Sequence, residues 1–180
     1  ASVRFDEDSR RRFDSIAERI HATGQPGIVF PDRIKRVSRE HNAVFAANVC
    51  GEAPLAVDES ALLASVNLVA FVEQDTAGRR AFDFSSFSRC VAICVRMLDG
   101  MHDLQTHASD AIRRNSLATR KVGVGVMGFA HALMLLDLPY GSDAAEAFAR
   151  ELSKRLYEAA RAESHRLAAR LGPYPAFGPG

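Results

Sequence analysis

The sequence lacks a long apolar run, and it has only three cysteines among its 180 residues. No apolar stretch reaches the roughly 20 residues that cross a bilayer, and no signal peptide opens the chain, so we expect neither a membrane partner nor export. The cysteines are odd in number and too few for a small disulfide scaffold. This usage favours a reducing compartment, and we expect a cytoplasmic protein.

Excess charge is also missing. The formal net charge is +1, which gives no general attraction to nucleic acid or to anionic lipid. The one basic run, Arg10–Arg12, is typical of a solvated helix face, so we expect no direct binding of nucleic acid. Apolar residues make up 47% and charged residues 25% of the chain, as in ordinary globular proteins. A chain of this length suits one domain, which we predict over residues 1–180.

Apolar periodicity and capping residues predict three helices. The first covers Asp8 to about Thr23 and ends at Gly24. The second, Asp83–Asp103, begins at a capping aspartate and carries a broad apolar face. The third runs from Ser142 to about Leu171 and ends at Gly172. We expect the two longer helices to pack on each other.

Shorter elements connect these helices. Ile28–Phe30 is expected to be an extended segment that enters the core, and Pro31–His41 a short helix with proline in its first turn. Leu62–Val72 is apolar with few breaks, so periodicity alone leaves strand and helix open. Val126–Asp137 is expected to be helical, and Asp75–Arg80 a surface connection. The predicted fold is mainly α with a few short strands, an α+β arrangement.

The glycine-rich segment Gly123–Gly128 formally matches the dinucleotide fingerprint G-x-G-x-x-G. That fingerprint also needs an acidic residue at the end of the next strand. The acids at a suitable distance, Asp143 and Glu146, fall inside the third predicted helix. We therefore reject a dinucleotide site and predict a structural role for the glycines.

Two pairs of chemically active residues lie on or near the second helix. Cys90 and Cys94 are one turn apart, a spacing that suits a metal or a redox pair but holds a disulfide poorly. We interpret both as core residues. His102 and His107 flank the end of the helix, where a cation meets the negative end of the dipole, and we expect both at the surface rather than as metal ligands.

The segment Asn48-Val49-Cys50-Gly51-Glu52 carries the most chemistry. An amide, a thiol and a carboxylate stand at alternate positions, and alternate side chains of an extended segment point the same way. Asn48, Cys50 and Glu52 are therefore the predicted site residues. The alternative is a loop with a half-buried free cysteine, since unpaired cysteines often act as small hydrophobic residues.

Motifs on both sides of this segment resemble one enzyme family. They lie at Gly24–Ile34, Glu59–Leu68, Arg120–Ala130, Leu138–Ser142 and Gly172–Phe177. In this order and spacing the chain resembles the catalytic subunit of ribonucleotide reductases, from about Phe13 to Phe177. It is most similar to the adenosylcobalamin-dependent class II enzymes, whose central five residues usually read Asn-Pro-Cys-Gly-Glu. The resemblance implies part of a ten-stranded barrel, with the Asn48–Glu52 loop as its catalytic finger loop, sheltered by the long helices.

The resemblance also implies a role for each site residue. Cys50 would form the thiyl radical that takes the 3′ hydrogen of a ribonucleotide. Glu52 would be the base for the 3′ hydroxyl, and Asn48 would hydrogen-bond the ribose hydroxyls. Adenosylcobalamin is the cofactor that the family likeness implies, although the family's region for binding it has no counterpart here. We therefore assign no cofactor-binding residue and no metal ligand.

The sequence departs from the family pattern at several points. Val49 replaces the usual proline. The family's two reducing cysteines are missing, because one normally lies further upstream and the other aligns with Ala61. The resemblance also ends before the family's phosphate loop and the second half of its barrel. We expect a second chain or another copy to complete the barrel.

Two interpretations stay open. In one, the chain is a working piece of a reductase within a larger or split assembly. In the other, it is a catalytically inactive binding or regulatory module derived from a reductase. A third interpretation is a thiol-dependent enzyme that uses Cys50 as a nucleophile.

Overall fold

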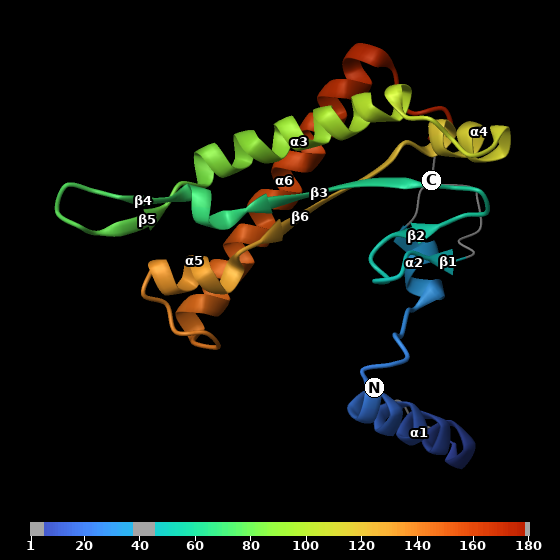
Figure 1. The fold of residues 1–180 in the computed structure, drawn as a ribbon, viewed down its shortest axis with the longest axis horizontal. Coiled ribbons are helices and arrows are strands. Elements are labelled where there is room, and N and C mark those ends of the chain that lie inside the picture. Colours follow the sequence, from blue (N-terminus) through green and yellow to red (C-terminus); the bar gives the residue numbers. More distant parts are fainter. Residues whose placement is uncertain (1–5, 38–45, 179–180) are drawn as a thin grey trace. The chain divides into compact units, whose positions relative to one another are not determined.

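The structure is a computed structural model that describes residues 6–37 and 46–178. The chain divides into two compact units. The first unit comprises residues 1–38 and 42–57, and the second comprises residues 39–41 and 58–180. Each unit is described by itself, so the expectation of a single domain stays a prediction. Figure 1 shows the elements of both.

The described residues of the first unit form two helices and a short hairpin. Helix α1 covers Glu7–Thr23 and α2 covers Pro31–Val37. The carboxylate of Asp6 caps α1 by accepting the Ser9 N–H at 2.7 Å, and Gly24 ends it in the left-handed conformation with φ 76°. Strands β1 (Ala46–Ala47) and β2 (Pro54–Leu55) pair antiparallel. Both predicted helices are confirmed over the described residues.

The apolar residues of this unit are more exposed than we predicted. The segment Ile28–Phe30 was expected to enter the core, but its three side chains are 52%, 47% and 58% exposed. The apolar stripe of α1 contains no buried residue, and Phe13 is 56% exposed. Periodicity identified the helix correctly because it records which side chains share a face. It does not record whether anything covers that face.

The second unit is built on two parallel strands. β3 (Ala61–Asn67) pairs with β6 (Lys121–Met127) over seven residue pairs, from Ala61 opposite Lys121 to Asn67 opposite Met127. Helix α3 (Phe84–Leu104) packs along both strands and against α6 (Asp143–Leu171) (Figure 1). Parallel strands need a long crossover, and α3 lies within it. The expected packing of the two long helices is confirmed.

The core lies where these elements meet. Its buried side chains come from β3, the following turn, α3, α5 and α6: Val66, Leu68, Phe87, Val91, Ala132 and Leu152. Aromatic rings extend it toward the start of α3, with ring centroids 4.9–6.0 Å apart among Phe71, Phe82, Phe84, Phe87 and Phe148. Helix α3 begins at Asp83, which caps it as predicted by accepting the N–H groups of Ser85 and Ser86.

Smaller elements correct the predicted boundaries. After β3 the chain forms the 3₁₀ turn η1 (Leu68–Phe71) and then a hairpin of β4 (Val72–Gln74) and β5 (Arg80–Phe82). The surface connection at Asp75–Arg80 is the turn of this hairpin, whose strands we did not predict. Helix α4 (Asp110–Thr119), capped by Ser109, was also missed. No helix in the described part of the chain has both the length and the apolar character that crossing a lipid bilayer requires.

The glycine-rich segment forms β6 and the start of α5 (Phe129–Leu135), so the helix begins three residues later than predicted. Its glycines make room for neighbouring side chains. A Cβ on Gly123 would lie 2.6 Å from Leu63 Cδ2, and one on Gly128 would lie 2.8 Å from Asn67 Oδ1. Gly128 also has φ 75°. The glycines therefore have the structural role we predicted. Gly123 lets β6 lie close to β3, and Gly128 leaves room for Asn67, which caps η1.

Gly128→Ala should lower the free energy of unfolding by about 1–2 kcal/mol, because alanine is strained at positive φ and its methyl group would crowd the Asn67 side chain. Urea denaturation followed by circular dichroism measures this. Gly125→Ala is the matched control, since its Cβ would make only ordinary contacts at 3.7 Å or more. Equal stability of the two variants would contradict the account.

Candidate active site

The Asn48–Glu52 segment forms the tight turn that joins β1 to β2. The Asn48 N–H donates to the Ala53 carbonyl at 3.2 Å, and the Gly51 N–H donates to the Asn48 carbonyl at 3.0 Å. Gly51 has φ 84°, a conformation that glycine adopts without strain. We expected an extended segment with alternating side chains, and this part of the prediction is wrong. The residues meet because the chain folds back on itself.

The side chain of Asn48 connects the two ends of the turn. Its Oδ1 accepts the Ala53 N–H at 3.0 Å, and its Nδ2 donates to Glu52 Oε1 at 2.5 Å. The amide therefore satisfies a backbone donor and orients the carboxylate at the same time. An amide does this without changing its own protonation state. The structure thus brings Asn48 and Glu52 into direct contact, as a shared site requires.

Cys50 lies between these two residues in the turn and is a free, exposed cysteine. Glu52 is exposed as well, and Asn48 is half-buried. The thiol is therefore not the half-buried apolar residue of our alternative interpretation. The long helices belong to the second unit, and their expected role in sheltering this loop stays a prediction.

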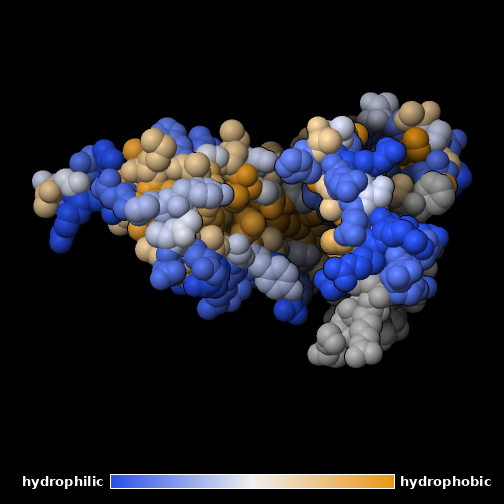
Figure 2. Space-filling model, turned by 90° about the horizontal axis from the view of Figure 1, so that it is seen from below, coloured by the Kyte–Doolittle hydropathy of each residue, from blue (hydrophilic) through white to orange (hydrophobic). Residues whose placement is uncertain are grey.

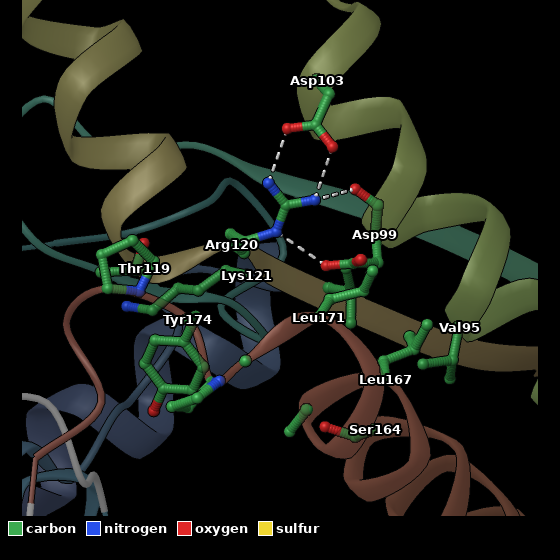
Figure 3. A pocket seen from close by; sticks show the side chains of 15 residues that line it. Val95, Asp99, Asp103, Thr119, Arg120, Lys121, Ser164, Leu167, Leu171 and Tyr174 are labelled. Atoms are coloured by element: carbon green, nitrogen blue, oxygen red, sulfur yellow. Dashed lines mark hydrogen bonds and ion pairs between the residues drawn. The ribbon is translucent and has the colours of Figure 1, made fainter.

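The second unit contains a charged cluster that we did not predict. At the start of β6 the Arg120 guanidinium reaches two carboxylates of α3 (Figure 3). Its Nε donates to Asp99 Oδ1 at 2.8 Å, and its two terminal nitrogens donate to Asp103 at 2.8 and 3.0 Å. The hydrogen bonds that Arg120 donates to Asp103 and then to Asp99 raise the pKa of Arg120, and the bond to Asp103 lowers the pKa of that carboxyl.

A cavity of about 480 Å³ adjoins this cluster, and Lys121 and Tyr174 also line it (Figure 3). Lys121 is held by Glu59, with Nζ 2.7 Å from Oε2. The cations that line the cavity, Arg120 and Lys121, are thus paired with carboxylates, and these paired charges do not indicate a ligand site. We interpret the cluster as a clamp between α3 and β6. It is not a second candidate active site.

His102 adds to this clamp, and our prediction that it lies at the surface is wrong. The side chain is 1% exposed, and its Nε2 lies 2.9 Å from the Lys121 carbonyl. A carbonyl only accepts, so Nε2 carries the proton and Nδ1 accepts from the Gln105 amide at 3.3 Å. Burial is the largest cause that lowers the pKa of His102, and the positive charge of Arg120 lowers it further. The imidazole is thus kept neutral.

The chain matches a family described as ribonucleotide reductase, barrel domain, over residues 6–179. The chain belongs to this family. It is 38% identical over 167 residues to a vitamin B12-dependent ribonucleoside-diphosphate reductase of Mycobacterium tuberculosis, a match that covers 92% of this chain and 23% of that protein. A reductase of the same name from Thermoplasma acidophilum is 32% identical over 171 residues, covering 94% of this chain and 22% of that protein.

A solved structure shows the same fold. The alpha subunit of the class Id ribonucleotide reductase of Actinobacillus ureae superposes with a TM-score of 0.75 at 23% identity, covering 95% of this chain and 34% of that one. The resemblance to reductases, and among them to the vitamin B12-dependent enzymes, is thereby confirmed. The chain spans less than a quarter of the length of these curated relatives.

Sequence reasoning missed the buried charged residues of this reductase-family chain. Glu163 of α6 is 1% exposed and is held by Arg96, 2.8 Å away, and by Arg166. Buried acids need such partners, because an isolated charge is costly to bury. An acid on the apolar face of a helix was the available signal. Glu163 stands at helical spacing from the core residues Leu152, Leu156 and Ala159.

The two cysteines of α3 lie where we predicted them, half-buried against the core, and both are free. Burial, and then the neighbouring Cys90 thiol, raises the pKa of Cys94. In the described part of the chain no three His, Cys, Asp or Glu side chains are grouped to hold a metal ion.

Asn48→Ala should expose the Ala53 N–H and speed its hydrogen exchange about five- to tenfold, because the turn loses a hydrogen bond that contributes about 1 kcal/mol. NMR-detected exchange measures this. Glu52→Gln is the control, since it leaves the Asn48–Ala53 bond in place. Unchanged exchange in the alanine variant would contradict the proposed role of Asn48 in the turn.

His102 should make the unfolding free energy fall as the pH drops below 6.5, its ordinary pKa. The native state binds this proton less readily than the unfolded chain, so acid favours unfolding by up to about 1.4 kcal/mol per pH unit. Urea denaturation between pH 7.5 and 5.5 measures the slope. In His102→Gln the amide can still donate to Lys121 but does not titrate, so the slope should become shallower. An equal slope in both proteins would contradict the neutral, buried imidazole.

Proposed function

We propose that this chain forms part of the catalytic barrel of a ribonucleotide reductase and carries its radical thiol at Cys50. One observation supports this most: in a chain of this family, Cys50 lies in the same tight turn as an amide and a carboxylate that are in contact. The substrate class follows from the family and is a ribonucleotide. The chemistry then follows from what each of the three groups can do.

The thiyl radical of Cys50 removes the hydrogen atom from C3′ of the ribose, which leaves an S–H bond and a carbon radical. Glu52 accepts the proton of the 3′ hydroxyl, for which a carboxylate must lie within hydrogen-bond reach. Asn48 orients Glu52 and hydrogen-bonds the ribose hydroxyls. A thiyl radical must also be kept from solvent. Because Cys50 is exposed here, we propose that a covering surface is added in the active assembly.

The net reaction replaces a C–O bond by a C–H bond, and it therefore consumes two electrons and releases water. In the family a pair of cysteines supplies these electrons and becomes a disulfide. Residue 61 offers no thiol, since it is alanine at the start of β3. The reducing dithiol must therefore come from another chain segment or from a small dithiol, and the disulfide product forms there.

The surface of the second unit has features that support the proposal of a partner that completes the barrel. In the described residues β6 pairs with β3 alone, and beside it lies an apolar groove of about 340 Å³. Val122, Val124 and Leu156 line this groove, and so does Tyr157, whose side chain is exposed. Figure 2 shows apolar side chains gathered in the middle of one face of this unit. A sheet with an uncovered edge and face is a template for another strand.

We propose that further barrel strands cover this groove. They would come from a second chain, from more of the same polypeptide or from a second copy. Adenosylcobalamin enters the proposal through the family alone. A corrin ring needs a broad binding surface, and the three polar side chains of the turn do not supply one. We therefore assign no step to the cofactor.

One observation favours a second function, that of a reductase-derived binding or regulatory module. Ala61 removes a thiol that the family's reaction cycle uses. Such a module would keep the fold and the clamp at Arg120, but it would not turn over substrate.

The discriminating experiment is ribonucleotide reduction with adenosylcobalamin and a dithiol, with and without chains that supply the other barrel strands. Cys50→Ser should abolish turnover in the completed assembly, because oxygen does not replace the radical sulfur. Glu52→Gln should lower turnover about 10²- to 10⁴-fold, the usual contribution of a catalytic base. Glu151→Gln, at a partly exposed position of α6 where the carboxylate pairs with Arg155, is the matched control and should retain activity.

Turnover that survives Cys50→Ser would overturn the radical proposal. A completed assembly that binds nucleotide but shows no turnover would support the regulatory module instead.

A further inference from the structure

Helix α3 carries a concentration of sulfur that the reductase reaction does not use. Of the chain's three cysteines and four methionines, two of each lie on this helix, at Cys90, Cys94, Met97 and Met101. Their spacings of four, three and four residues place all four side chains on one face of the helix. We call this face the sulfur stripe.

The sulfur stripe lies at the border between core and solvent. The buried face of α3 is formed by other residues, among them Phe87, Val91 and Leu98. Both cysteines are half-buried against that core, while Met97 is 51% and Met101 41% exposed. A small ion could therefore reach the thiols from solvent, and the core would shield them from behind.

Cys90 and Cys94 stand one helical turn apart on α3. Side chains one turn apart have Cβ atoms about 5–6 Å apart, whereas a disulfide needs about 3.5–4.5 Å. A metal ion between two sulfurs adds two bonds of about 2.3 Å each, so it spans the longer gap without distorting the helix. The spacing thus suits a bridging ion better than a disulfide.

The ligand set indicates which ion this would be. Thiolate and thioether sulfurs are soft ligands that suit Cu(I), zinc and iron–sulfur clusters. Iron–sulfur clusters are commonly held by four cysteines, and this helix has two. Zinc prefers four nitrogen or sulfur ligands, and the described residues offer no such group here. We propose that Cys90, Cys94 and Met97 bind one Cu(I) ion, with Met101 beside them as a further thioether. The two thiols release their protons to solvent, two thiolate–copper bonds and one bond from the Met97 thioether form, and copper stays in the +1 state throughout.

This proposal is independent of the reductase chemistry, because it uses neither Cys50 nor Glu52. The test is anaerobic titration of the 180-residue chain with Cu(I), buffered by the competing chelator bicinchoninate and followed by absorbance. We expect one ion per chain, with X-ray absorption showing sulfur-only coordination. Cys90→Ser and Cys94→Ser should each weaken binding at least about 100-fold, and Met97→Leu about tenfold.

Matched variants make the result decisive. Met127→Leu removes a thioether of similar exposure outside the sulfur stripe, and Cys50→Ser removes the exposed thiol; both should bind copper as the parent chain does. Circular dichroism confirms that each variant is folded. Binding that persists in Cys90→Ser, that is lost in Cys50→Ser, or that involves nitrogen ligands would overturn the site. No binding at all would identify the stripe as an apolar docking face only.

Discussion

The parallel pairing of β3 with β6 is the constraint on which the second unit depends. Two parallel strands cannot be joined by a tight turn, so about fifty residues must leave one strand and return to the start of the other. Helix α3 is the longest element of this connection, and its apolar side chains pack against the strands. Two contacts tie the C-terminal end of α3 to the start of β6. Arg120 donates a hydrogen bond to the Asp99 carboxylate of α3, and His102 of α3 donates one to the Lys121 carbonyl. The clamp thus ties the end of α3 to the point where β3 and β6 begin to pair, with Ala61 opposite Lys121.

The sequence predicts those features of the fold that local chemistry decides. Asp83 and Ser142 cap the helices we expected them to cap, and Gly24 and Gly172 end helices, because capping depends on a few neighbouring backbone groups. Burial was harder to predict. His102 and Glu163 are buried because partners far along the chain satisfy them, Lys121 in one case and Arg96 in the other. No local pattern encodes such partners, and the short strands β4 and β5 gave no periodic signal either.

The candidate site, too, was predicted in part from local sequence and in part wrongly. The residue types at Asn48, Cys50 and Glu52, together with the family motifs around them, are the basis on which we predict this segment as the site. The reasoning from strand alternation was wrong, since a turn and the Asn48–Glu52 hydrogen bond bring the groups together. The family match supports the ancestry of the segment, and the turn geometry is compatible with the roles proposed for it. Exposure of the thiol agrees with a chain that works beside other barrel segments.

The central claim is that Cys50 carries the radical, and electron paramagnetic resonance tests it most directly. A chain with Cys90 and Cys94 replaced by serine leaves Cys50 as the one cysteine, which can then be labelled with deuterium at its β carbon. The labelled chain would be assembled with the completing strands, adenosylcobalamin and a ribonucleotide, and frozen during turnover. The account predicts a sulfur-centred radical whose hyperfine splitting collapses on deuteration. A radical signal that is unchanged by the label would contradict it.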